Sequence, residues 1–313
     1  MKRLGPLLGL GIVYLFFVLV GPEAFATTRT LETIARQTAI VGTAALGMTM
    51  VIVAGGIDLS VGSIVALASV VVALTLDGGY GGPLTAVAAA AAAGAFCGLV
   101  SGTLITRLRV APFIVTLGML LLVRGAAKGL GKEQKVDAPM TWLVDLLSSL
   151  PPDRRWMIVP PGVWLLAFLA LATAFVLRYT KLGAHFFAIG SNEETARLCG
   201  VAVERVKVVV YTLSGALAGL TGVLQFSRLT VGDPTVAVGL ELDVIAAVVI
   251  GGGSLSGGEG TVLGTLVGAF IMTVIRTGTA QMGLPNWVQE IVTGVIIIAA
   301  VAIDRWRHRR LDA

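Results

Sequence analysis

The stretch Asn192–Glu193–Glu194–Thr195–Ala196–Arg197–Leu198–Cys199–Gly200 is polar and lies between apolar segments. Asn192 can cap a helix here, and the preceding Ser191 is spaced from Glu194 as in a capping box. Gly200 can supply the left-handed residue that ends the helix. A helix of roughly two turns does not hold in water by itself. The stretch therefore predicts a docking element, and the rest of the chain must indicate what it docks on.

The rest of the chain is too apolar for a soluble domain. Of its 313 residues, 56% are hydrophobic and only 13% are charged, and the mean hydropathy is +0.91. Soluble proteins carry about 25% charged residues. Because apolar runs recur from end to end, we predict an all-α polytopic transmembrane helical bundle that forms one membrane domain over residues 1–313.

Apolar runs predict about ten transmembrane helices, or eight crossings if a glycine-rich break lies inside one helix. The first run also resembles a secretory signal with a cleavage site at 24–26, but the polytopic remainder favours an uncleaved helix. The runs are 7–20, 38–54, 61–76, 84–105, 112–127, 162–177, 208–226, 240–250, 261–278 and 288–303.

Basic residues predict the orientation of the bundle. Placing both termini and the loops 107–109 and 178–207 in the cytoplasm collects 13 of the 23 lysines and arginines there. The segment 131–160 then lies on the opposite side. The sequence pI near 9.5 does not indicate nucleic-acid binding, because the basic residues flank apolar runs and form no face interleaved with aromatics.

Two glycine-rich segments share one pattern. Both 55–62 and 251–258 read Gly–Gly–x–x–Leu–Ser–x–Gly, and each interrupts an apolar run. Matched breaks in two halves of a membrane protein are typical of a transport pathway, since unwound backbone offers polar groups to a solute. The predicted pathway residues are Gly56, Asp58, Ser60, Gly252, Ser254 and Ser256.

The alternative is that these segments only begin helices. Asp58 is a good capping residue, and Ser256 and Glu259 have the spacing of a capping box. Arg124 and Arg276 fall near predicted helix ends, where snorkelling to the interface is expected.

Glycines at four-residue spacing predict close contacts between helices. Gly94, Gly98 and Gly102 form one such series, and the pairs at 215 and 219 and at 264 and 268 form two more. Nothing in the sequence indicates an enzyme: no nucleophile or metal-ligand spacing is present, and no cofactor is expected.

Three motifs together resemble the ribose-type ABC sugar permeases. They are 55–63, the Asn–x–x–x–Ala–x–x–x–Gly run of 192–200, and 249–258, and the resemblance extends from about residue 5 to residue 305. Gly253 stands where many members carry a larger residue, a departure that leaves the assignment unchanged.

The resemblance implies a transmembrane permease subunit of an ATP-driven importer in the bacterial inner membrane, a multi-pass protein in the lipid bilayer. It implies three partners: an ABC ATPase subunit that hydrolyses ATP, a periplasmic sugar-binding protein that delivers a monosaccharide, and a second permease subunit in a homodimer or heterodimer. The helix at 192–200 would be the coupling helix, with Ala196 and Leu198 filling a groove of the ATPase. The predicted coupling residues are Asn192, Glu193, Glu194, Ala196, Arg197, Leu198 and Gly200.

Two other functions compete with this one. A secondary active carrier for a small polar solute would need a network of membrane carboxylates, and Asp58 is the one candidate expected to lie deep. A scaffold or regulatory membrane protein would have no use for broken helices, which are costly unless they line a pathway.

Overall fold

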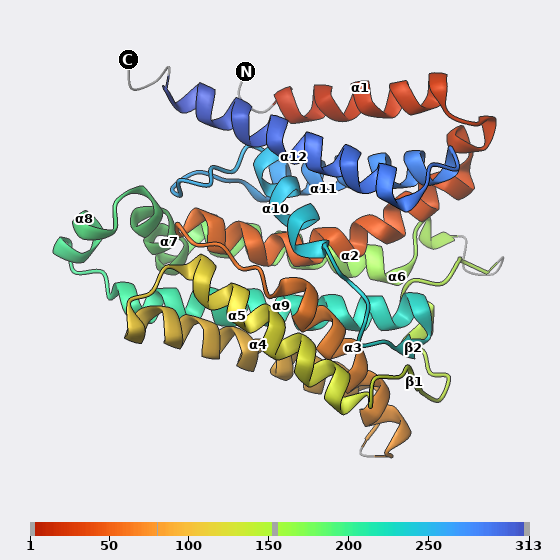
Figure 1. The fold of residues 1–313 in the computed structure, drawn as a ribbon, viewed down its shortest axis with the longest axis horizontal. Helices are drawn as coiled ribbons and strands as arrows, with labels where there is room; N and C mark the ends of the chain where they lie inside the picture. The colour runs from red at the N-terminus through yellow and green to blue at the C-terminus, as the bar shows by residue number, and fades with distance from the viewer. Residues whose placement is uncertain (1–3, 80, 152–155, 310–313) are drawn as a thin grey trace.

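The helices follow the apolar runs. The structure is a computed structural model that describes residues 4–79, 81–151 and 156–309, and this part of the chain is an all-α bundle with two very short strands (Figure 1). The first six helices are α1 (Leu4–Val20), α2 (Thr28–Val53), α3 (Val61–Asp77), α4 (Pro83–Leu108), α5 (Pro112–Leu130) and α6 (Pro161–Tyr179). The others are α7 (Lys181–Ser191), α8 (Glu193–Leu198), α9 (Val203–Leu229), α10 (Leu240–Ile250), α11 (Val262–Gln281) and α12 (Asn286–Arg309). The strands are β1 (Val136–Asp137) and β2 (Val231–Gly232).

Local sequence sets where six of the twelve helices in the described residues begin. Proline opens α4, α5 and α6, where its missing N–H is not needed. Threonine side chains at 27, 180 and 261 cap α2, α7 and α11 by accepting a backbone N–H three residues on. The starts of these six helices therefore follow from residues that can be recognised in the sequence.

Six helices of the described chain are long and apolar enough to cross a membrane: α2, α4, α5, α6, α9 and α11. Three shorter apolar helices lie at Gly5–Val20, Val61–Asp77 and Asn286–Ala299. Large apolar side chains on α1, α5 and α6 point away from the bundle, as lipid-facing residues do. The bundle architecture is as predicted from composition, while ten or eight crossings remain a prediction.

The core of the bundle is centred on α2. Every residue from Thr38 to Val53 is buried. Two threonine pairs hydrogen-bond α2 to α11, Thr38 to Thr273 at 2.6 Å and Thr49 to Thr265 at 2.7 Å. Such bonds between membrane helices are worth about 0.6 kcal/mol each. Polar residues of α2 therefore help to fix its neighbour in place.

The predicted glycine contacts join α4 to α9. A Cβ atom added at Gly94 would overlap the carbonyl oxygen of Gly215, and one added at Gly98 would overlap that of Tyr211. At Gly102 it would lie 2.8 Å from Cα of Val208. The two backbones touch along this face, which confirms the series as a close helix contact.

The two ends of the bundle carry different elements. Helix α8 projects from one end, and β1 and β2 lie at the other (Figure 1). The strands pair antiparallel, and an ion pair of 3.7 Å joins Lys135 to Asp233 beside them. Segments 178–207 and 131–160 are thus at opposite ends, as the predicted orientation requires. Residues 152–155 of the second segment, and the chain ends 1–3 and 310–313, lie outside the described residues.

A labelling experiment tests the orientation. Native Cys199 is exposed beside α8 and Cys97 is buried, so the wild-type chain already carries a probe at that end. We expect a membrane-impermeant maleimide to label Cys199 only after intact cells are permeabilised. In a Cys199→Ser chain, Met140→Cys should be labelled in intact cells, because Met140 is 77% exposed in segment 131–160. Labelling of Cys199 in intact cells would invert the orientation.

Candidate coupling and transport site

Helix α8 is built as its sequence predicts. The Asn192 side chain accepts a hydrogen bond from the backbone N–H of Thr195 at 2.8 Å, and Gly200 has a φ of +85°. Asn192 rather than Ser191 is the cap, because Ser191 is the last residue of α7. The Val201 N–H then donates to the Ala196 carbonyl at 3.1 Å, which closes the end of the helix.

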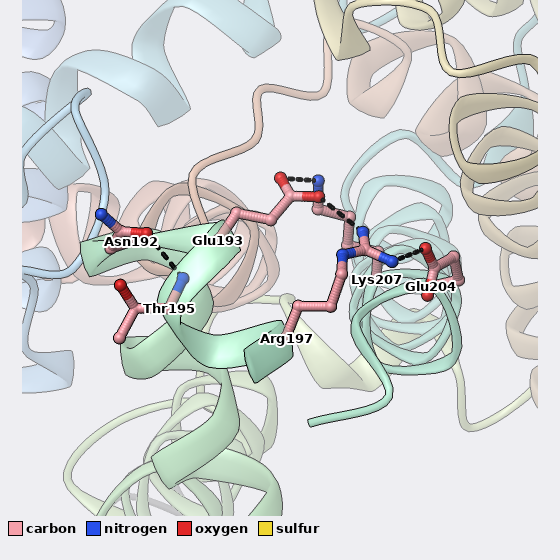
Figure 2. Close-up of polar contacts among 6 residues, drawn as sticks. All are labelled: Asn192, Glu193, Thr195, Arg197, Glu204 and Lys207. Atoms are coloured by element: carbon pink, nitrogen blue, oxygen red, sulfur yellow. Dashed lines mark hydrogen bonds and ion pairs between the residues drawn. The ribbon is translucent and has the colours of Figure 1, made fainter. Parts of the chain in front are cut away.

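Charged side chains fix α8 to the start of α9 (Figure 2). The Lys207 ammonium lies 2.6 Å from the Glu193 carboxylate, and Arg197 contacts both Glu193, at 3.4 Å, and Glu204. The hydrogen bond to Glu204 raises the pKa of Arg197. Exposed ion pairs contribute little stability one by one. Their arrangement nevertheless directs Glu193 and Arg197 toward this chain and sets the direction in which α8 projects.

The two apolar residues of α8 face in different directions. Ala196 is only 4% exposed, whereas Leu198 is 88% exposed. The Ala196 methyl group packs within this chain and does not reach the surface. Leu198, with Glu194 and the end of the helix around it, forms the exposed face of α8. This division between the two side chains could not be read from the sequence of so short a helix.

The first glycine-rich break, 54–60, holds a buried carboxylate. The Asp58 side chain is fully buried and accepts from the N–H of Ser60 at 2.9 Å and from its hydroxyl at 2.6 Å. Ser60, not Asp58, precedes the first residue of α3. The hydroxyls of Thr116 and Tyr211 both lie 3.3 Å from the Ile57 carbonyl, so neighbouring helices bind the unwound backbone.

The second break, 251–260, is a closed loop. The N–H of Ser254 donates to the Glu259 carbonyl at 3.1 Å, and that of Gly257 donates to the Ser254 carbonyl at 3.0 Å. No helix begins at Ser256, so the capping-box alternative is wrong there: the left-handed Gly257 and Gly258 turn the chain, and α11 begins after Thr261. The Ser254 hydroxyl accepts from the Ser256 N–H at 3.2 Å instead.

The structure brings the two breaks together at their ends. The Gly258 N–H donates to the Val53 carbonyl, which precedes the first break, at 2.9 Å. The predicted pathway residues differ in accessibility: Gly56, Asp58, Ser60 and Ser254 are buried, Gly252 is half-buried and Ser256 is exposed. Gly252 borders a cavity of about 700 Å³ that α1, α6, α7 and α11 also line. Four of the six predicted pathway residues are therefore buried in this structure.

Two arginines form contacts that were not predicted. Arg276 forms a 2.6 Å ion pair with Asp243, whose side chain is 1% exposed. Arg124 donates to the carbonyls of Pro234 and Val236 at 3.1 and 2.6 Å. Protein groups hold both arginines, and snorkelling of either one to the interface remains a prediction. Among the described residues, Asp58 is not the sole buried acidic residue. The sequence signal that could have predicted the ion pair is Asp243, an acidic residue in the first turn of the mainly apolar α10.

Comparisons with known proteins find a matching family and several relatives of this chain. Residues 30–301 match the family described as branched-chain amino acid transport system / permease component. The ribose import permease protein of Escherichia coli (strain K12) is 41% identical over 280 residues, which cover 90% of this chain and 87% of that protein. The ribose import permease protein of Bacillus subtilis (strain 168) is 39% identical, covering 97% and 93%. The fructose import permease protein of Rhizobium meliloti is 36% identical, covering 93% and 81%. No solved structure matches.

Proposed function

Because the chain belongs to this family of import permease components, we propose that it is the membrane-spanning subunit of an ATP-driven importer of a monosaccharide. It is a multi-pass inner-membrane protein with six helices able to span the bilayer. Its relatives are named for the import of ribose and fructose, which are both monosaccharides. They therefore support a monosaccharide as the substrate class. ATP hydrolysis belongs to a separate ABC ATPase subunit.

The exposed face of α8 is the observation that carries this proposal. A six-residue helix, capped and held by ion pairs at the cytoplasmic end, presents a leucine that is 88% exposed. A single exposed apolar residue is ordinary on a protein surface, but Leu198 lies on a short projecting helix whose direction is set by ion pairs, and this supports a contact role. The ATPase is the partner that an importer subunit needs on this side, and Leu198 would insert into it.

The remaining partners follow from the two ends of the bundle. A periplasmic binding protein would deliver the sugar at the end that carries β1 and β2. A second permease subunit, identical or related, would complete the transport path. The breaks at 54–60 and 251–260 would line that path when it opens, with Asp58, Ser60, Ser254 and Ser256 offering hydrogen bonds to hydroxyl groups.

Transport by membrane vesicles tests the function directly. The binding protein acts on the periplasmic face, which is enclosed in inside-out vesicles. The assay therefore requires right-side-out vesicles or proteoliposomes that contain the permease, its ATPase and its binding protein. We expect uptake of radiolabelled ribose, arabinose or fructose that needs ATP inside and persists when the proton gradient is collapsed. Uptake that follows the proton gradient would identify a secondary carrier instead. The family description names branched-chain amino acids, so leucine is tested as well. Uptake of leucine and of none of the three sugars would show that the substrate is an amino acid and not a monosaccharide.

A further inference from the structure

Three segments that are far apart in the sequence meet at Gly190, the second-last residue of α7. A Cβ atom added at Gly190 would overlap the carbonyl oxygen of Val53 and would lie 2.5 Å from the backbone nitrogen of Gly258. Gly55 packs on the same glycine, since its own added Cβ would lie 3.6 Å from Cα of Gly190. Gly190 thus fills the space between the end of α2 and the second glycine-rich break.

The backbones at this point leave no room for a side chain. A Cβ atom added at Gly257 would lie 2.6 Å from the Gly190 carbonyl oxygen, and one at Gly258 would lie 3.1 Å from Cα of Ser191. Gly257 and Gly258 have φ values of +87° and +74°, a region that other residues rarely adopt. The hydrogen bond from Gly258 to Val53 then ties the second break to α2 across Gly190. Packed backbone of this kind does not deform gradually, so its parts move together.

Helix α8 begins directly beyond this joint, which comprises Val53, Gly55, Gly190, Gly257 and Gly258. Asn192, the cap of α8, is two residues after Gly190, and α7 continues without interruption up to Ser191. A displacement of α8 would therefore act on Gly190 through the two residues between them, Ser191 and Asn192. From Gly190 it reaches both breaks, because each of them touches that residue.

We infer that Gly190 is a positioning residue that couples movement of α8 to both glycine-rich breaks. This inference rests on the proposed function, and it adds the route by which the ATPase-facing helix opens and closes the path. The coupling requires a glycine at position 190. A methyl group there would push α7 away from Val53 and Gly258 and break the contact among the three segments.

The test compares Gly190→Ala with Gly125→Ala in the complete transporter. Gly125 is also a helical glycine, but a Cβ atom there meets nothing within 4 Å. We expect Gly190→Ala to retain the ATPase on co-purification, because the surface of α8 is unchanged. ATP hydrolysis should continue, while sugar imported per ATP hydrolysed falls at least tenfold, measured with the labelled sugar that the wild-type complex imports. Gly125→Ala should match the wild type in all three measurements.

Equal import per ATP in Gly190→Ala and the wild type would overturn the inference and leave the proposed function intact. Absence of ATP-dependent import in the wild type would instead remove the proposed function. If Gly190→Ala does not fold, hydrogen exchange of the wild-type complex decides. If α8 is coupled to the breaks, adding ATP should change the protection of the peptide covering 251–260 together with that of the peptide covering 181–191. Equal protection of 251–260 with and without ATP would contradict the inference.

Discussion

Leu198→Glu is expected to abolish ATP-dependent import and to separate the permease from its ATPase. Leu198 is 88% exposed, so its replacement leaves the packing of this chain unchanged. Burying a leucine in an interface contributes about 1.5–3 kcal/mol, and a carboxylate in the same apolar contact is unfavourable in addition. A loss of about 2 kcal/mol already weakens affinity by roughly 30-fold. Co-purification of the tagged permease with the ATPase, followed by vesicle uptake, measures both effects.

The matched control is Met140→Glu. Met140 is 77% exposed but lies in segment 131–160, at the opposite end of the bundle. It should keep the ATPase bound. Ala196→Trp is a less direct test, because Ala196 is buried within this chain and a large side chain there would displace α8 itself. If Leu198→Glu retains the ATPase and Met140→Glu loses it, the coupling surface has been assigned to the wrong end.

Gly98→Leu is expected to prevent the bundle from folding. A Cβ atom at Gly98 overlaps the Tyr211 carbonyl oxygen and lies 3.1 Å from Cα of Thr212, so the obstacle is backbone of α9 rather than a movable side chain. Overpacking usually lowers the free energy of unfolding by about 1–3 kcal/mol. Because the backbone of α9 cannot move aside easily, we expect the loss for Gly98→Leu to be at or above the upper end of that range. Separating α4 from α9 would also open the contact between Gly94 and Gly215.

The measurement is the fraction of permease that remains monodisperse after extraction in detergent, together with its thermal unfolding midpoint. We expect that fraction to fall at least tenfold for Gly98→Leu. Gly118→Leu is the control, since nothing lies within 4 Å of a Cβ atom at that position of α5. Its yield and midpoint should stay near those of the wild type. Wild-type stability in Gly98→Leu would show that α4 and α9 are not held by direct backbone contact.

Residues close together in the sequence allowed several features to be predicted. Asn192 and Gly200 define α8 because a cap and a left-handed terminus act on backbone groups within one turn. The apolar runs predict the bundle because a run of that length has no other stable placement in a lipid bilayer. The spacing of Gly94, Gly98 and Gly102 predicts a close helix contact on the same local grounds.

Which residues contact one another across the bundle was decided by the tertiary structure. No local rule says that Gly98 meets Tyr211, or that Arg276 pairs with a buried Asp243 on another helix. The capping box at Ser256 was wrong for the same reason: the chain there turns through Gly257 and Gly258 to hydrogen-bond with Val53. A contact with distant backbone outweighed a favourable local pattern.

The sequence by itself therefore determined a membrane bundle, a short capped helix and two glycine-rich interruptions. Only the tertiary structure decided that Leu198 faces outward while Ala196 is buried, and that both interruptions meet at Gly190. The physical reason is one of range. Capping, turn formation and partition into lipid depend on a few consecutive residues, whereas burial and backbone contact depend on which distant helices the whole chain packs beside each other.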